Sequence, residues 1–166
     1  MPKGRVSNRV VLWWVIIAAV AGANSCLAAD WPQWRGPTRD GVWIETGLVE
    51  RFESPQLPLK WRVPIGRGYS GPTVAQGRVF VMDRVAEPNA RERVLSFDAG
   101  TGREMWSYAY ECRYQGVQYE AGPRSSVTID EGRAYALGTM GHLHCFEAQS
   151  GKLLWKHDCR QEYGAK

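Results

Sequence analysis

The segment FDAGTGREMW, residues 97–106, recurs as FEAQSGKLLW, residues 146–155. The two copies lie 49 positions apart without a gap, and four of their ten positions are identical. The positions that define this repeat motif are Asp98, Thr101, Gly102 and Trp106 in the first copy and Glu147, Ser150, Gly151 and Trp155 in the second. Self-similarity at a fixed period of about 20–50 residues is typical of repeat architectures, and the fold prediction depends on it.

The repeat extends upstream of this motif. AQGRVFVM at residues 75–82 matches DEGRAYAL at residues 130–137 with an offset of 55, so the first copy holds six additional residues. We expect them within residues 84–93, in a lengthened surface hairpin, because insertions are tolerated at loop tips.

Each copy predicts a run of β-strands. Side chains alternate over residues 79–82 and 134–137, which places one set on each face of a sheet. A second strand ends at Phe97 or Phe146, and a third carries the tryptophan. The turn between these strands ends on the glycine of the motif, which suits the left-handed conformation of many hairpins. The sequence therefore predicts an all-β fold.

Residues 96–106 resemble the repeat signature of pyrroloquinoline-quinone-type (PQQ-type) propellers, A-x-D-x-x-T-G-x-x-x-W, and residues 145–155 resemble it less closely. In that family the tryptophan docks between adjacent blades, which the resemblance implies for Trp106 and Trp155. Trp61, 45 residues before Trp106, looks like the tryptophan of a preceding strand. The resemblance implies a partial propeller of four-stranded antiparallel blades, about two to three of the eight that the family commonly has. We therefore expect the remaining blades to be missing from this chain.

Residues 1–29 are expected to be a signal peptide that directs export. Three basic residues precede an apolar run at residues 10–23, which is shorter than the about 20 residues that span a bilayer. Cleavage is expected after Ala29, and an uncleaved anchor or a lipid on Cys26 are the alternatives. We expect residues 30–56 to form an irregular segment, because they include WPQWRGPTRDG, and residues 57–166 to hold the repeats.

Net charge argues against nucleic acid as a partner. Residues 1–29 hold three of the 21 Lys and Arg and no acidic residue, which leaves 18 basic against 17 acidic residues in the mature chain. A phosphate-binding surface needs clustered positive charge. We also expect no transmembrane span in the mature chain.

The mature chain has three cysteines, Cys112, Cys145 and Cys159, so at most one pair can close within it. Cys112 and Cys159 each follow a repeat tryptophan and are the first pair to consider. Buried or free thiols are the alternative.

His142 and His144 alternate along one predicted strand and share a face. Two such histidines can bind a metal, but no third ligand follows at a fixed spacing. We therefore predict that both lie on a solvated face and that the chain has no metal site.

The resemblance implies either of two functions. One is a binding or scaffold module in the periplasm or cell envelope, with envelope proteins as partners and no catalysis by this chain. The alternative is the N-terminal fragment of a PQQ-dependent quinoprotein dehydrogenase. Such enzymes often carry adjacent cysteines, which are absent here, and the acidic residues fall mainly at predicted turns and loops. We therefore predict no catalytic and no cofactor-binding residues, with PQQ and calcium possible only if a full propeller follows.

Overall fold

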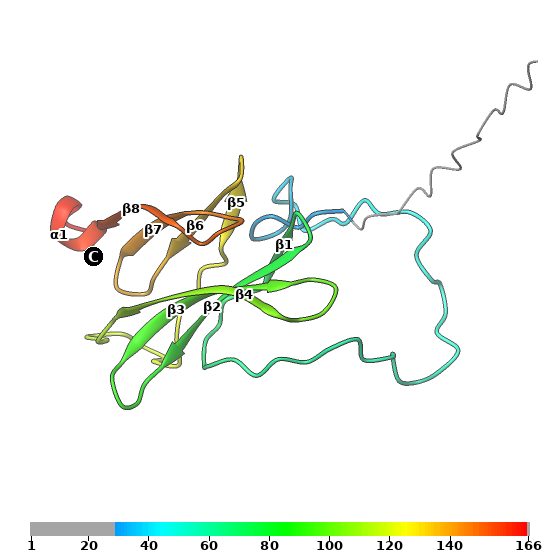
Figure 1. Ribbon diagram of the computed structural model, residues 1–166, viewed down its shortest axis with the longest axis horizontal. Helices are drawn as coiled ribbons and strands as arrows, with labels where there is room; N and C mark the ends of the chain where they lie inside the picture. The colour runs from blue at the N-terminus through cyan, green and yellow to red at the C-terminus, as the bar shows by residue number, and fades with distance from the viewer. Residues whose placement is uncertain (1–28, 166) are drawn as a thin grey trace, which may run out of the picture.

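The computed structural model describes residues 29–165. Residues 1–28 of the expected signal peptide, which include Cys26, lie outside the described residues. The described chain forms two four-stranded antiparallel sheets, each with its strands in sequence order. The first sheet consists of β1 (Thr73–Ala75), β2 (Arg78–Val85), β3 (Arg91–Asp98) and β4 (Glu104–Glu111). The second consists of β5 (Thr128–Asp130), β6 (Arg133–Leu137), β7 (His142–Glu147) and β8 (Leu153–Asp158), and α1 (Cys159–Tyr163) follows it. Figure 1 shows the two meanders, so the predicted class of four-stranded antiparallel blades is confirmed.

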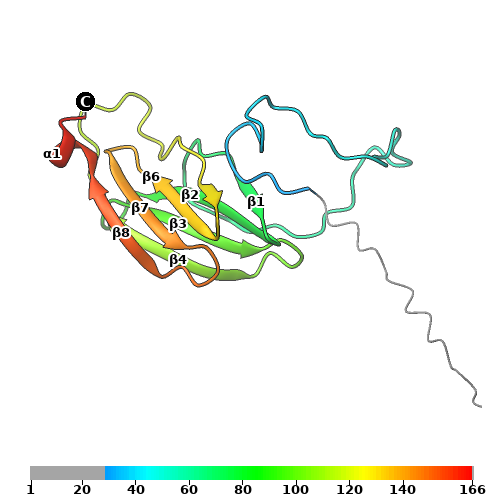
Figure 2. The same ribbon diagram turned by 90° about the horizontal axis from the view of Figure 1, so that it is seen from above.

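The two blades stack face to face (Figures 1 and 2). Large side chains of the first blade, Phe80 and Met82, meet the small Ala134 and Ala136 of the second in one buried cluster. Both alanines are fully buried, and Phe146 joins them from β7. Packing large residues against small ones lets the sheets interdigitate without voids, so this cluster is the core that the two repeats share.

Two short inner strands escape the sequence prediction. β1 and β5 have three residues each, too few for alternation to be visible. Each is joined to the next strand by two residues with positive φ, at Gln76 and Gly77 and again at Glu131 and Gly132. This turn geometry matches the right-handed twist of paired strands, so the same hairpin starts both blades.

The prediction that the six additional residues lengthen a hairpin within residues 84–93 is confirmed, but they extend its strands more than its tip. Most of them lengthen β2 and β3, whose pairing continues through Asp83 with Arg93, Arg84 with Glu92 and Val85 with Arg91. The extension is not a solvated tip, because Asp83 and Glu92 are fully buried. Asp83 accepts from the Arg93 guanidinium at 2.8 Å and forms an ion pair with it.

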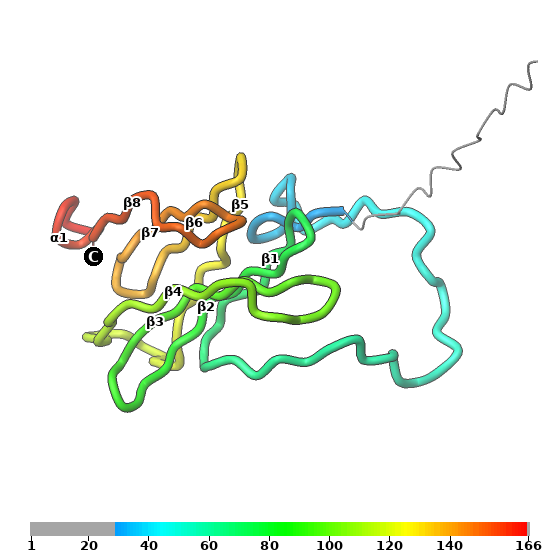
Figure 3. Tube along the Cα trace, in the orientation of Figure 1, coloured from blue at the N-terminus to red at the C-terminus, as the bar shows by residue number. Residues whose placement is uncertain are grey.

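The N-terminal part of the described chain follows the inner edges of both blades. Trp31 pairs with Val74 of β1 through two backbone hydrogen bonds of 2.7 and 2.9 Å. Residues 42–66 then make a long excursion without strand or helix before the chain reaches β1, as the tube in Figure 3 traces. No helix within residues 29–165 is long and apolar enough to cross a membrane.

Candidate functional site

The tryptophan of the first repeat lies at the junction of the two blades. The Trp106 indole nitrogen donates to the Ala148 carbonyl at 2.9 Å, and a Cβ added to Gly151 would lie 2.5 Å from the ring. Trp106 also contacts Phe80 and Phe146, with ring centroids 6.0 and 5.6 Å apart. Only a residue without a side chain allows this approach, so Trp106 and Gly151 form one interblade contact.

Trp61 makes the same contact one repeat earlier. Its indole nitrogen donates to the Ala99 carbonyl at 3.0 Å, and a Cβ on Gly102 would lie 2.7 Å from its ring. Gly102 and Gly151 have φ of 73° and 72°, the left-handed region that favours glycine. In both turns an Ala-x-x-Gly segment therefore supplies a carbonyl and a bare Cα to the indole.

The other motif residues hold these turns. The Asp98 carboxylate accepts from the Thr101 amide and hydroxyl at 2.8 and 2.7 Å, and these bonds lower the pKa of Asp98. In the second turn the Ser150 hydroxyl donates to Glu147 and accepts from the Lys152 amide. Asp98, Thr101, Glu147 and Ser150 thus stabilise the turns that present the two glycines.

Trp155 has the motif position of Trp106 but a different environment. Its side chain is 38% exposed and contacts Tyr135 and His157, with ring centroids 6.0 and 5.4 Å apart. Within residues 29–165, no carbonyl accepts from its indole nitrogen. The outer face of the second blade therefore presents a repeat tryptophan without the contact that Trp61 and Trp106 make.

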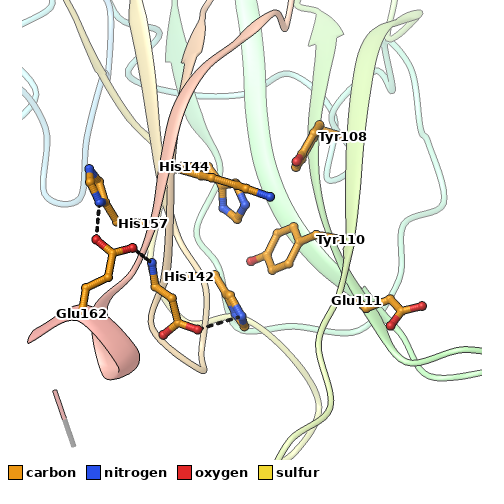
Figure 4. A pocket seen from close by; sticks show the side chains of 9 residues that line it. Tyr108, Tyr110, Glu111, His142, His144, His157 and Glu162 are labelled. Atoms are coloured by element: carbon orange, nitrogen blue, oxygen red, sulfur yellow. Dashed lines mark hydrogen bonds and ion pairs between the residues drawn. The ribbon is translucent and has the colours of Figure 1, made fainter. Parts of the chain in front are cut away.

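A pocket of 380 Å³ opens between the outer strands of the two blades. Figure 4 shows His142 and His144 of β7 facing Tyr108 and Tyr110 of β4, while His157 of β8 lies beside Glu162. The lining residues are Tyr108, Tyr110, Glu111, His142, His144, Lys156, His157, Asp158 and Glu162.

The prediction that His142 and His144 lie on a solvated face is wrong for His144. That side chain is 3% exposed and lies against Tyr110 and Tyr108, with ring centroids 4.4 and 5.4 Å away. The face of β7 that carries both histidines is covered by β4 of the first blade, which a single-strand pattern does not reveal. Burial, helped by the nearby His142 and Lys156, lowers the pKa of His144 to about 4.

The remaining imidazoles of the pocket are paired with carboxylates. His157 Nδ1 lies 2.6 Å from Glu162 Oε2, and His142 Nε2 lies 3.8 Å from Asp158 Oδ2. Hydrogen bonds from the Asp158 amide and from His157 lower the pKa of Glu162. In the part of the chain that the structure describes, no three His, Cys, Asp or Glu residues are arranged to hold a metal ion.

Glu92 is a buried carboxylate that the sequence did not single out. It accepts from the hydroxyls of Tyr110 and Tyr114, each at 2.5 Å, and from the Thr139 amide at 3.1 Å. Burial raises the pKa of Tyr110, and the adjacent Glu92 raises it further. This network ties β3 and β4 of the first blade to the β6–β7 turn of the second, so it acts as a polar counterpart to the Trp106 contact.

The three cysteines of the described chain are free thiols. The pair considered first, Cys112 with Cys159, therefore does not form, and the alternative holds. Burial and then the neighbouring Glu92 raise the pKa of Cys112 to about 12, so its thiol is protonated near neutral pH.

A family model described as the outer membrane protein assembly factor BamB, a PQQ-like repeat family, matches residues 90–166. Residues 90–166 are PQQ-like repeats. The match spans β3 to α1, so it includes both Ala-x-x-Gly turns together with Trp106 and Trp155. The PQQ-like repeats keep the turn glycine and the tryptophan in both copies, while Glu147 and Ser150 replace the aspartate and threonine in the second.

Several solved structures resemble the chain. A europium-containing methanol dehydrogenase is 19% identical with a TM-score of 0.45, over 62% of this chain and 18% of that one. BamB from Moraxella catarrhalis is 20% identical with a TM-score of 0.36, over 53% and 22%. A quinohemoprotein alcohol dehydrogenase from Pseudomonas putida HK5 is 21% identical with a TM-score of 0.44, over 62% and 15%. The chain thus spans less than a quarter of each of these proteins, and no curated protein matches it.

Proposed function

We propose that this chain is an exported binding or scaffold module of the cell envelope and does not itself catalyse a reaction. The observation that carries the proposal is the exposed outer face of the second blade. Trp155 and Leu137 are 38% and 42% exposed there, whereas the equivalent Trp106 and Met82 of the first blade are covered by the second. An exposed apolar face of this kind is typical of a surface that another polypeptide covers.

The repeat geometry supports one kind of partner for this face. Trp61 and Trp106 each donate a hydrogen bond to the alanine carbonyl of an Ala-x-x-Gly turn and pack on the glycine of the same turn. Trp155 has the same strand position, since it pairs with Cys145 as Trp106 pairs with Ser96. We therefore assign the face to a further PQQ-like repeat that carries such a turn.

The carboxylates of the blades support a structural role over a catalytic one. Asp98 is bonded to its own turn, Asp83 to Arg93, and Glu92 to two tyrosines. Each is thus already satisfied by protein donors. A general base needs a carboxylate that can reach a substrate proton, and these three do not offer one.

Site-specific photo-crosslinking tests the proposal. A benzophenone side chain at Trp155 is compared with one at Leu154, which is 45% exposed on the opposite face of β8 and is the matched control. Mass spectrometry of material from the envelope fraction should find a crosslinked peptide with an Ala-x-x-Gly turn at position 155 and not at 154. Equal crosslinking at both positions, or none at Trp155, would count against the proposal.

A further inference from the structure

The segment of residues 30–41 is held across the inner edges of both blades. Its Trp31 pairs with Val74 of β1, and its Pro32 carbonyl accepts from the Ile129 amide of β5 at 2.7 Å. The Trp31 ring lies on Gly36, where an added Cβ would be 2.8 Å from it. Three backbone bonds close the turns of this segment, from Gly36 to the Gln33 carbonyl, from Arg39 to the Gly36 carbonyl and from Gly41 to the Arg35 carbonyl, at 3.0, 3.2 and 2.9 Å. The segment is therefore a fixed platform, not a loose tail.

This platform presents Trp34 outward. The Trp34 side chain is 67% exposed although it lies beside Gly71, whose added Cβ would be 3.6 Å from the ring. Three adjoining pockets of 380, 250 and 330 Å³ meet at Trp34. We call this region the Trp34 surface, and its lining includes Gln33, Trp34, Arg35, Arg39, Tyr69, Arg124, Ser125, Ser126 and Thr128. The ring of Trp34 is therefore accessible to a ligand.

The Trp34 surface carries uncompensated positive charge. Its arginines donate to neutral acceptors: Arg35 to the Asp40 carbonyl, Arg39 to the Gln33 side chain and Arg124 to the Tyr119 carbonyl, at 3.1, 2.9 and 3.1 Å. Among the described residues, none of the three forms an ion pair and no carboxylate lines the three pockets. Asp40 lies beside Arg35, but its carboxylate accepts from the Val42 amide at 2.9 Å, and this bond is the main cause of its lowered pKa, with Arg35 a minor one. The surface thus fits a ligand that brings its own negative charge.

We propose that the Trp34 surface binds an acidic carbohydrate whose sugar rings carry carboxylates. The C–H face of a pyranose packs against an exposed aromatic ring, which Trp34 and Tyr69 provide at 67% and 53% exposure. Guanidinium groups recognise carboxylates with paired N–H donors. The hydroxyls of Ser126 and Thr128 and the amide of Gln33 can form hydrogen bonds with sugar hydroxyls. An aromatic carboxylic acid, the other kind of ligand that brings a ring and a negative charge, lacks these hydroxyls.

The extent of the surface favours several sugar units. The three pockets are open and all of them are lined by Trp34, in contrast to the single enclosed cavity that holds a small cofactor. This inference goes beyond the proposed function, because it involves the inner edges of the blades and not the face of Trp155. Either can fail without the other.

Isothermal titration of the purified chain with tetragalacturonate tests the inference. Binding should weaken at least tenfold in Trp34→Ala and in Arg39→Gln, and it should weaken with added salt because exposed charges are screened. Tyr163→Ala and Arg103→Gln are matched controls, since both side chains are exposed and lie outside the Trp34 surface. These controls should bind as the unmodified chain does.

Two further ligands test the carboxylates and the sugar rings separately. Neutral maltotetraose should bind at least tenfold more weakly than tetragalacturonate, because it lacks the carboxylates. Tetraglutamate should also bind at least tenfold more weakly, because it lacks the sugar rings. Equal binding of tetraglutamate and tetragalacturonate, no binding of tetragalacturonate, or unchanged binding by Trp34→Ala would each overturn the inference.

Discussion

Trp106 of the first blade lies on the bare Cα of Gly151 in the second, and its indole nitrogen donates to the Ala148 carbonyl at 2.9 Å. Trp61 and Gly102 repeat this contact one blade earlier. The sequence repeat therefore reflects a contact between blades that recurs once in each repeat. Because the tryptophan and the glycine belong to different repeats, each blade is completed by its neighbour.

Truncating the interblade tryptophan should be costly. Trp106→Ala is expected to lower the free energy of unfolding by about 3–5 kcal/mol, the range for truncation of a large buried aromatic. Trp34→Ala, at a side chain that is 67% exposed, should change it by less than about 0.5 kcal/mol. Urea melts followed by far-UV circular dichroism measure both. Losses of similar size would mean that Trp106 is not an anchor.

Stability should depend on pH through His144. Its pKa falls from 6.5 to about 4 on folding, so the unfolded chain takes up a proton at a higher pH than the folded chain does. The contribution is complete above pH 6.5 and is lost as the pH falls toward 4, by up to roughly 3 kcal/mol. Neighbouring His142 and Lys156 add to this effect, and Glu92 opposes it.

His144→Leu is the matching variant, because Leu95 holds this position in the first repeat. Unfolding free energies from urea melts at pH 4.5 and 7 should differ less in this variant than in the unmodified chain. The same pH dependence in both proteins would exclude His144 as the group responsible.

The buried carboxylate of Glu92 should be needed for the junction. Glu92→Gln keeps the shape of the side chain but replaces one accepting oxygen with an NH2 group. That group is a donor and faces the donors that Glu92 accepts from, so the free energy of unfolding should fall by about 1–3 kcal/mol. Glu50→Gln, at an exposed position in the long excursion, is the control. Thermal melts compare the two variants, and equal midpoints would contradict the hydrogen-bond network described above.

Catalysis by this chain is not expected. Purified chain supplied with PQQ and calcium should give no turnover of alcohols or sugars with an artificial electron acceptor. A commercial quinoprotein dehydrogenase under the same conditions provides the positive control. Robust turnover by this chain would favour the quinoprotein alternative over the scaffold role.

The repeat made the fold predictable from sequence, because Trp106 and Trp155 follow a turn glycine at the same distance in both copies. The burial of His144 was not predictable in this way. A period of two shows that His142 and His144 share a face, but the blade that covers the face comes from elsewhere in the chain. Glu92 was missed for the same reason, since its partners Tyr110 and Tyr114 lie 18 and 22 residues away.

The most direct test of the interblade contact compares two glycines of the second blade. Gly151 and Gly132 have φ of 72° and 75°, so alanine at either position is strained, at about 1–2 kcal/mol. An added Cβ at Gly132 meets nothing within 4 Å, whereas at Gly151 it lies 2.5 Å from Trp106. The difference in unfolding free energy between Gly151→Ala and Gly132→Ala, from urea melts, therefore isolates the contact. The account predicts that Gly151→Ala loses at least about 2 kcal/mol more, the scale of an overpacked core, and equal losses would contradict it.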